Sequence, residues 1–263
     1  MIIDAHTHIG SGGAIIARAE SLLQSMDAAR IDRSLVFAGH INECPTERML
    51  EAIAKYPDRL HGVGAVSPLK GEAFNPRLNE IDRLLANGAL VALKFYLGYE
   101  HFYPHDMIID PYLDLLEKNG RPAIFHTGNC YSKVGGALAK YARPMEIDDL
   151  AIRRPNLKII LAHMGNPWII DAAEMCYKNA NVYADCSGFV EHAFNDASRK
   201  HFRGALGYFL DYVGSPDKLL FGTDWPIATQ QDYRAVMRGL RFDAATREKI
   251  MHQNAAKLFG IHC

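Results

Sequence analysis

Short apolar segments alternate along the chain with longer segments of helical periodicity. The apolar segments are rich in β-branched and aromatic residues and end near Gly, Pro, Asn or Ser, which is typical of buried strands. Their nearly continuous apolar character predicts a parallel sheet that is covered on both faces. Eight such segments are present, at residues 1–9, 33–39, 60–68, 89–98, 121–129, 157–165, 181–188 and 218–226.

The segments between these strands repeat Leu, Ile and Ala at spacings of three and four residues and end at Gly or Pro, as amphipathic helices do. Eight strands that alternate with helices in 263 residues predict an α/β fold of the closed (β/α)8, or TIM barrel, type. An open doubly wound sheet is the alternative. Clear helical examples are residues 19–30, 47–56, 78–88 and 111–120.

Two further helices are predicted after the eighth strand, over 229–242 and 243–260. Asp243 is a suitable N-cap for the second helix, and Gly260 is a suitable residue to end it. We expect both helices to complete the outer layer of the barrel. Since no linker of low complexity and no block of charge divides the chain, a single domain over residues 1–263 is predicted.

Composition narrows the kinds of partner. The chain has 29 Lys and Arg against 30 Asp and Glu, so no broad basic field would attract nucleic acid or anionic lipid. Five scattered cysteines without a CxxC pair argue against a disulfide framework and against a thiolate zinc site. There is no secretory leader pattern and no long apolar run. We therefore expect a cytoplasmic protein that acts on a small molecule, with no nucleic-acid or membrane partner.

Polar side chains gather near the C-terminal ends of the predicted strands, where a barrel of this type carries its chemistry. His6 and His8 are two residues apart on one strand, so they point to the same face and can bind one ion. Imidazoles and a carboxylate suit zinc, with iron, manganese and cobalt as alternatives. One histidine alone is more typical of a hydrogen-bonded core residue, but the whole set predicts a metal site: His6, His8, Lys94, His126, His163 and Asp224.

The motif DAHTH at residues 4–8, followed in order by IFHTG, LAHMG and LLFGTDWP, resembles the amidohydrolase superfamily along the whole chain. It looks most like the amidohydrolase 2 branch, which includes aminocarboxymuconate semialdehyde decarboxylase and related decarboxylases, hydratases and hydrolases. The resemblance implies a barrel enzyme with one or two divalent ions, zinc foremost. Homo-oligomers are common among similar proteins, and the sequence leaves open whether this chain forms one.

The resemblance also implies a role for each matching residue. His6, His8 and Asp224 would bind the metal, with His126 as the fourth ligand. In a hydrolytic mechanism, Asp224 or His163 would move the proton. In a site with one metal His163 would orient or deprotonate the activated water, and in a site with two metals it would bind the second ion.

Lys94 bears on the number of ions, because superfamily members with two metals bridge them with a carboxylated lysine on the fourth strand. Burying an ammonium group without a partner costs several kcal/mol. Carboxylation of Lys94, a carboxylate partner and contact with an anionic substrate would each compensate that cost, and the sequence leaves all three open.

Residues around the metal ligands complete the predicted site. Asp4 shares a strand face with the two histidines but lies deeper, so we expect it to hydrogen-bond near the site rather than to bind the ion. Loop residues after the strands are candidates for contact with the substrate. They are Tyr96, Asn166 and Trp225, together with Tyr99, His101, Tyr131, His40 and Asn42.

These features predict a metal-dependent hydrolase that cleaves an amide, lactone or ester bond of a small polar molecule with a metal-activated water, whose pKa zinc lowers to about 7. The alternative is non-oxidative decarboxylation of a small unsaturated or aromatic carboxylic acid at the same metal site. A barrel that binds a ligand without turnover is a third interpretation. It would be expected to lack a metal ligand, and none is missing from the motif.

Overall fold

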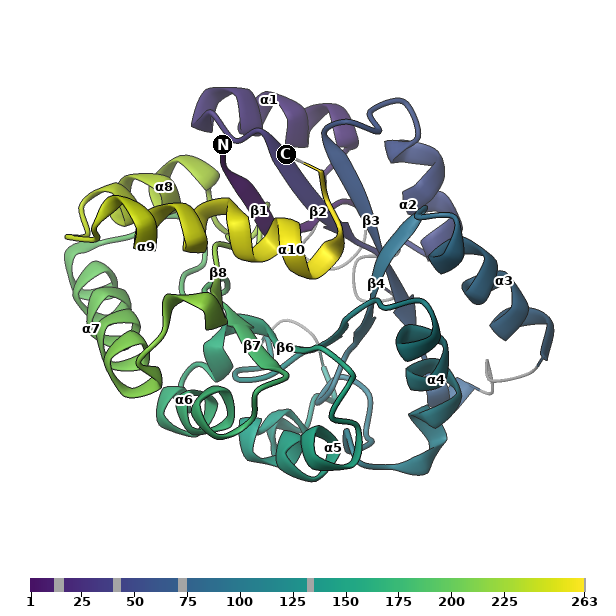
Figure 1. Ribbon diagram of the computed structural model, residues 1–263. Coiled ribbons are helices and arrows are strands. Elements are labelled where there is room, and N and C mark those ends of the chain that lie inside the picture. The colour runs from purple at the N-terminus through teal and green to yellow at the C-terminus, as the bar shows by residue number, and fades with distance from the viewer. Residues whose placement is uncertain (12–16, 40–43, 71–74, 132–134, 263) are drawn as a thin grey trace.

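The computed structural model is a ring of eight parallel strands surrounded by helices, the barrel that the strand pattern predicts (Figure 1). It describes residues 1–11, 17–39, 44–70, 75–131 and 135–262. Each strand pairs in parallel with the next one along the chain. The strands are β1 (Ile3–His8), β2 (Arg33–Phe37), β3 (Leu60–Val66), β4 (Leu90–Phe95), β5 (Ala123–Phe125), β6 (Ile159–Leu161), β7 (Val182–Asp185) and β8 (Leu219–Leu220).

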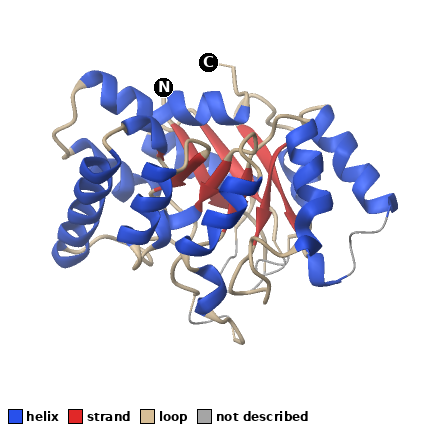
Figure 2. Ribbon diagram, turned by 60° about the horizontal axis from the view of Figure 1, so that its bottom comes forward, coloured by secondary structure: helices blue, strands red, loops and turns tan. Residues whose placement is uncertain are grey.

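Helices cover the outside of the ring, so the strands lie at the centre of the molecule (Figure 2). None of the described helices is long and apolar enough to cross a membrane. The α-helices are α1 (Ala19–Ala29), α2 (Thr46–Ile53), α3 (Asn75–Ala86), α4 (Asp110–Lys118), α5 (Asp148–Arg153), α6 (Ile169–Lys178), α7 (Asp196–Val213), α8 (Gln230–Arg238), α9 (Ala244–Glu248) and α10 (Asn254–Phe259). Short 3-10 turns are η2 (Pro68–Lys70), η3 (Met107–Ile109), η4 (Ala139–Ala142), η5 (Pro144–Ile147), η6 (Ala162–Gly165) and η7 (Pro216–Lys218).

The predicted helix over 243–260 is present, but it is divided and its position differs from the prediction. The side chain of Asp243 accepts a hydrogen bond from Thr246 N (2.7 Å), and Gly260 ends the segment at a φ of 67°. A π-helical turn, η8 (Lys249–Gln253), joins α9 to α10.

Rather than completing the outer layer, α10 lies across the open end of the barrel beside the two chain termini (Figure 1). Its apolar side chains pack into the cluster of apolar residues that fills the inside of the ring. The residues that α10 and the turn after it contribute to this cluster are Ala255, Leu258, Phe259 and Ile261.

The ring closes between β1 and the segment that follows β8. Although β8 contains only two paired residues, the chain after it continues along β1 and forms the missing hydrogen bonds. Asp224 N donates to His6 O (2.8 Å), and His8 N donates to Trp225 O (2.7 Å). We call the contact between β1 and residues 221–225 the closing seam. It aligns Asp224 with the two histidines of β1.

A β-bulge in β1, between Asp4 and Thr7, changes which side chains face the pocket. The extra residue interrupts the regular alternation of side chains along a strand. The prediction that Asp4 shares a face with His6 and His8 is therefore wrong. Asp4 hydrogen-bonds rather than facing the pocket, and its carboxylate accepts from Gln230 Nε2 of α8 (2.8 Å).

Asp4 also stabilises the closing seam. Its carboxylate accepts hydrogen bonds from Thr223 N (3.0 Å) and Thr223 Oγ1 (2.7 Å), and the group is fully buried. Burial raises the pKa of Asp4 to about 7, although these hydrogen bonds oppose the rise. One carboxylate thus connects β1, the seam and α8.

We predict that Asp4→Ala lowers the free energy of unfolding by roughly 2–4 kcal/mol, because the buried donors of Thr223 and Gln230 lose their acceptor. Urea denaturation measures the loss as a lower midpoint at an unchanged slope. Asp211→Ala, at an exposed aspartate of α7, is the matched control. Equal midpoints for the two variants would contradict the role of Asp4 in the seam.

Candidate metal centre

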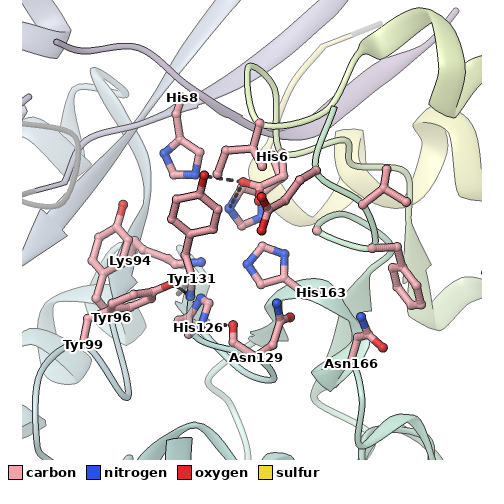
Figure 3. Close-up of a pocket in the computed structure, with 16 residues that line it drawn as sticks. His6, His8, Lys94, Tyr96, Tyr99, His126, Asn129, Tyr131, His163 and Asn166 are labelled. Carbon is pink, nitrogen blue, oxygen red and sulfur yellow. Dashed lines mark hydrogen bonds and ion pairs between the residues drawn. The ribbon is translucent and has the colours of Figure 1, made fainter. Parts of the chain in front are cut away.

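A pocket of about 260 Å³ opens at the C-terminal ends of the strands, where the sequence places its polar residues (Figure 3). Side chains from β1 and β4, and from the loops after β4 to β8, meet there. The pocket is lined by His6, His8, Lys94, Tyr96, Tyr99, His126, Asn129, Tyr131, His163, Asn166, Gly188, Phe189, Val190, Glu191, Asp224 and Ile227. All six residues of the predicted metal site are among them.

His6, His8 and Asp224 form a buried cluster whose ligand atoms all lie within 4.8 Å of one another. Asp224 Oδ1 is 3.1 Å from His8 Nε2 and 3.8 Å from His6 Nε2. Within the described part of the chain His6 Nε2 has no hydrogen-bond partner, although it is buried. Two imidazole nitrogens and a carboxylate oxygen suit a divalent ion such as zinc or manganese. This cluster therefore fits a metal.

Left-handed backbone turns the chain sharply at two places beside the cluster. Asp224 has a φ of 67°, and His163 and Met164 at the end of β6 have φ values of 65° and 46°. Such conformations are uncommon for residues other than glycine and cost of order 1–3 kcal/mol each. The hydrogen bond from Asp224 N to His6 O holds one of these turns in place.

Asp185, the last residue of β7, orients two histidines of the pocket. Its Oδ2 lies 2.9 Å from His6 Nδ1. Its Oδ1 accepts a hydrogen bond from the hydroxyl of Ser187, and Ser187 Oγ in turn lies 2.8 Å from His163 Nδ1. One carboxylate thus contacts His6 directly and His163 through a serine.

These contacts determine which nitrogen of each ring carries the proton. An ionised carboxylate only accepts, so His6 Nδ1 is the donor to Asp185 and His6 Nε2 keeps a free lone pair for a metal. Ser187 gives its single hydroxyl proton to Asp185, so its oxygen accepts from His163 Nδ1. His163 Nε2 therefore also has a free lone pair, directed away from Ser187.

The electrostatics of the pocket favour neutral imidazoles and ionised carboxylates. Burial, aided by the charge of Lys94, lowers the pKa of His6 to about 3, and burial likewise lowers the pKa of His163. Burial alone would raise the pKa of the Asp224 carboxyl. The hydrogen bond with His8 and the electrostatic attraction of the neighbouring histidine rings outweigh burial and hold that pKa well below its usual range. These are the protonation states that metal ligands need.

His126 reaches the pocket but has a different partner. Its Nε2 lies 3.2 Å from the backbone oxygen of Asn129, and its ring packs against Tyr99 and His163. Its ligand atoms fall outside the cluster formed by His6, His8 and Asp224. The assignment of His126 as a fourth metal ligand stays a prediction.

The predicted substrate contacts divide into two groups. Tyr96, Tyr99, Tyr131 and Asn166 line the pocket. Trp225 and His101 do not: Trp225 packs against the hydrophobic core, and His101 Nε2 contacts Gly136 O (2.9 Å) on the surface. His40 and Asn42 lie outside the described residues.

Sequence reasoning missed Asp185, Ser187 and Gly188. The segment ADCSG places an aspartate at the end of the seventh strand, which is the position that made Asp224 a candidate on the eighth. Gly188 has a φ of 70°, and a Cβ atom there would collide with the ring of His163. A glycine at this point therefore allows the imidazole to approach Ser187.

Comparison with known proteins agrees with this architecture. A family model described as amidohydrolase matches residues 3–261. The chain is similar to a probable 2-pyrone-4,6-dicarboxylic acid hydrolase from Acinetobacter baumannii with citric acid bound (20% identity, TM-score 0.75, covering 98% of this chain and 99% of that chain).

Two solved structures that contain a metal ion are also similar to this chain. One is an amidohydrolase from Burkholderia multivorans with bound zinc (17% identity, TM-score 0.75, covering 100% of both chains). The other is 5-carboxyvanillate decarboxylase from Novosphingobium aromaticivorans complexed with manganese (16% identity, TM-score 0.75, covering 99% of this chain and 96% of that chain). At such identities these structures show a shared fold.

We predict that protein purified without chelator carries at least one equivalent of divalent metal. The double variant His6→Ala/His8→Ala should lose most of it, because two of the three clustered ligands are removed. Elemental analysis by mass spectrometry measures the metal content. A double variant that retains the wild-type content would show that the ion is held elsewhere.

We further predict that Asp185→Asn weakens metal affinity by about 10- to 100-fold, the usual loss when the partner of a ligating histidine is removed. Asparagine keeps the size of the side chain but no longer holds the proton on His6 Nδ1. Competition with a metal-binding dye measures the affinity. Asp171→Asn, on the surface of α6, is the control and should leave the affinity unchanged.

Proposed function

The chain belongs to the amidohydrolase family, and on this basis we propose that it is a metal-dependent hydrolase of an amide, lactone or ester bond in a small polar molecule. We propose zinc as the ion, because the cluster offers imidazole nitrogens and a carboxylate oxygen. The observation that carries the proposal is a neutral imidazole, His163, that faces the same pocket as the cluster with Nε2 free.

His163 suits a general base better than a general acid. Burial lowers the pKa of its ring, so the neutral form predominates at neutral pH, and Ser187 holds the proton on Nδ1. Hydrolysis begins with removal of a proton from water, which a neutral imidazole can perform. Decarboxylation instead requires a protonated group that delivers a proton to carbon.

A divalent ion held by His6, His8 and Asp224 would supply the Lewis acidity that lowers the pKa of water and polarises a carbonyl. His163 Nε2 takes a proton from the attacking water, whose oxygen bonds to the carbonyl carbon of the substrate. The imidazolium then returns that proton to the leaving nitrogen or oxygen as the bond to it breaks. Ser187 and ionised Asp185 stabilise the imidazolium while it exists.

Decarboxylation of an unsaturated or aromatic acid is the second candidate, and the wall of the pocket favours it. Tyr96, Tyr99 and Tyr131 gather on the side where Lys94 enters (Figure 3). Aromatic side chains of this kind can stack on a planar ring. The similar manganese-containing structure is that of a decarboxylase, whereas the similar structure with citric acid is that of a probable hydrolase.

A screen that reports two products separates the candidates. Zinc-loaded protein is incubated with panels of lactones, amides, esters and carboxylic acids, and both hydrolysis and CO₂ release are measured. We expect hydrolysis of members of the first three panels. Release of CO₂ without any hydrolysis would overturn the hydrolase proposal in favour of the decarboxylase.

On the substrate found in that screen, His163→Asn should lower kcat by roughly 10²- to 10⁴-fold, the contribution typical of a general base. Metal content should stay at the wild-type level, because His163 is outside the cluster of His6, His8 and Asp224. His105→Asn, at a histidine stacked on Tyr103 away from the pocket, is the control. A loss of metal in His163→Asn would show that His163 is a ligand instead.

A further inference from the structure

Lys94 extends from β4 into the pocket, toward the space that His126 and His163 also face (Figure 3). Its side chain is almost completely buried, with a relative exposure of 1% for the residue. The strand pairing places Lys94 beside Ile124 of β5, deep in the ring rather than in a loop. Its position is therefore rigid, and its terminal amine is presented at a defined place.

The ammonium group of Lys94 has no hydrogen-bond partner among the residues that the structure describes. The described carboxylates that affect it most, Asp185 and Asp224, raise its pKa but lie beyond ion-pair distance. Burial outweighs them and lowers the pKa of Lys94 to about 8, which still leaves the amine mostly protonated at neutral pH. A buried cation without a hydrogen bond is costly unless something else binds it.

The rings next to Lys94 compensate only part of that cost. Its Nζ lies 5.2 Å from the centre of the Phe37 ring and 5.5 Å from that of Tyr96. Such cation–π contacts contribute about 0.5–2 kcal/mol. They orient the ammonium group but supply no hydrogen-bond acceptor.

A second metal ion next to Lys94 is not favoured by the surrounding ligands. The other described group with metal-binding spacing is His6, His163 and Asp185. His6 donates from Nδ1 to Asp185 and offers its Nε2 to the first cluster, and both oxygens of Asp185 already accept hydrogen bonds. Only His163 Nε2 is left for a second ion. An anionic partner for Lys94 is the simpler explanation.

The charges of the site with a divalent ion bound indicate which kind of ligand Lys94 would bind. Asp224 and Asp185 are the described buried carboxylates that contact the histidine rings, and together they balance a divalent ion. Among the buried groups described, the ammonium of Lys94 then remains without a balancing charge, because Glu191, the other carboxylate that lines the pocket, is exposed. No arginine lines the described pocket, so it lacks the donor clusters that usually bind phosphate groups.

We propose that Lys94 is a specificity-determining residue that binds a carboxylate group of the substrate. The proposal rests on the proposed function in that it takes this pocket as the substrate site. The carboxylate accepts hydrogen bonds from Nζ, which places the scissile part of the molecule toward His163 and the cluster. Substrates with one carboxylate next to the reacting group are therefore preferred to their neutral amides.

Binding of isophthalate to the metal-loaded protein tests this proposal directly. Isophthalamide has a similar shape without charge, so the pair measures what the carboxylates contribute through Lys94 and through the ion together, and the Lys94 variant separates these two contributions. By isothermal titration calorimetry we expect wild-type protein to bind isophthalate at least about tenfold more tightly than isophthalamide, the difference typical of a hydrogen bond to a charged group. This comparison requires no variant.

Lys94→Met removes the ammonium group and keeps most of the side-chain length. We expect it to weaken isophthalate binding by about tenfold or more, to leave isophthalamide binding unchanged and to keep the metal content of the wild type. Lys200→Met, at an exposed lysine of α7, controls for the loss of one positive charge from the protein. It should bind both compounds as the wild type does.

Several results would overturn the proposal. These are equal binding of isophthalate and isophthalamide, no binding of isophthalate, tighter binding of inorganic phosphate than of isophthalate, and unchanged isophthalate binding in Lys94→Met. Two metal ions per chain together with a carboxylate adduct on Lys94 in intact-mass spectra would assign the lysine to a metal bridge instead. Because binding is measured without turnover, a failed hydrolase screen and a failed carboxylate site give different results.

Discussion

Closure of the barrel between its first strand and the segment after its last strand is the constraint on which the site depends. The closing seam is made of individual hydrogen bonds rather than a long ladder, since β8 contributes only two paired residues. The same bonds that close the ring also align Asp224 with His6. Ring closure and assembly of the candidate metal ligands are therefore one event. A change that opens the seam separates the carboxylate from the histidines even if each strand stays folded.

Next to the closing seam, two buried carboxylates each bond to several partners. Asp4 connects the seam to α8 on one side of β1, while Asp185 orients His6 and His163 on the pocket side. The His6 ring also stacks on Phe37 at 4.1 Å, which restricts its rotation. In an environment of low dielectric, hydrogen bonds of this kind are strong and missing ones are costly. The site is thus rigid before any ligand enters.

Local patterns in the sequence were sufficient for the barrel and for part of the site. Strand and helix periodicity depends on neighbouring residues, so the eight strands and the caps at Asp243 and Gly260 were predictable. The bulge in β1 was not predictable, because it arises from pairing with the segments on either side of β1. The sequence prediction therefore placed Asp4 on the wrong face. Asp185 was missed because its role arises from a contact with His6 across 179 positions of sequence. The fourth-ligand role of His126 and the dual roles of His163 stay predictions.

The closing seam also determines when, during synthesis of the chain, the site can assemble. During synthesis β1 emerges from the ribosome early, whereas Asp224 follows only after the other strands have been made. Until then one edge of β1 has no strand to pair with, and an unpaired edge is prone to wrong contacts. An ion that arrived at this stage would find His6 and His8 without Asp224. Metal capture therefore belongs to the last stage of biogenesis, when the two ends of the barrel sequence have met.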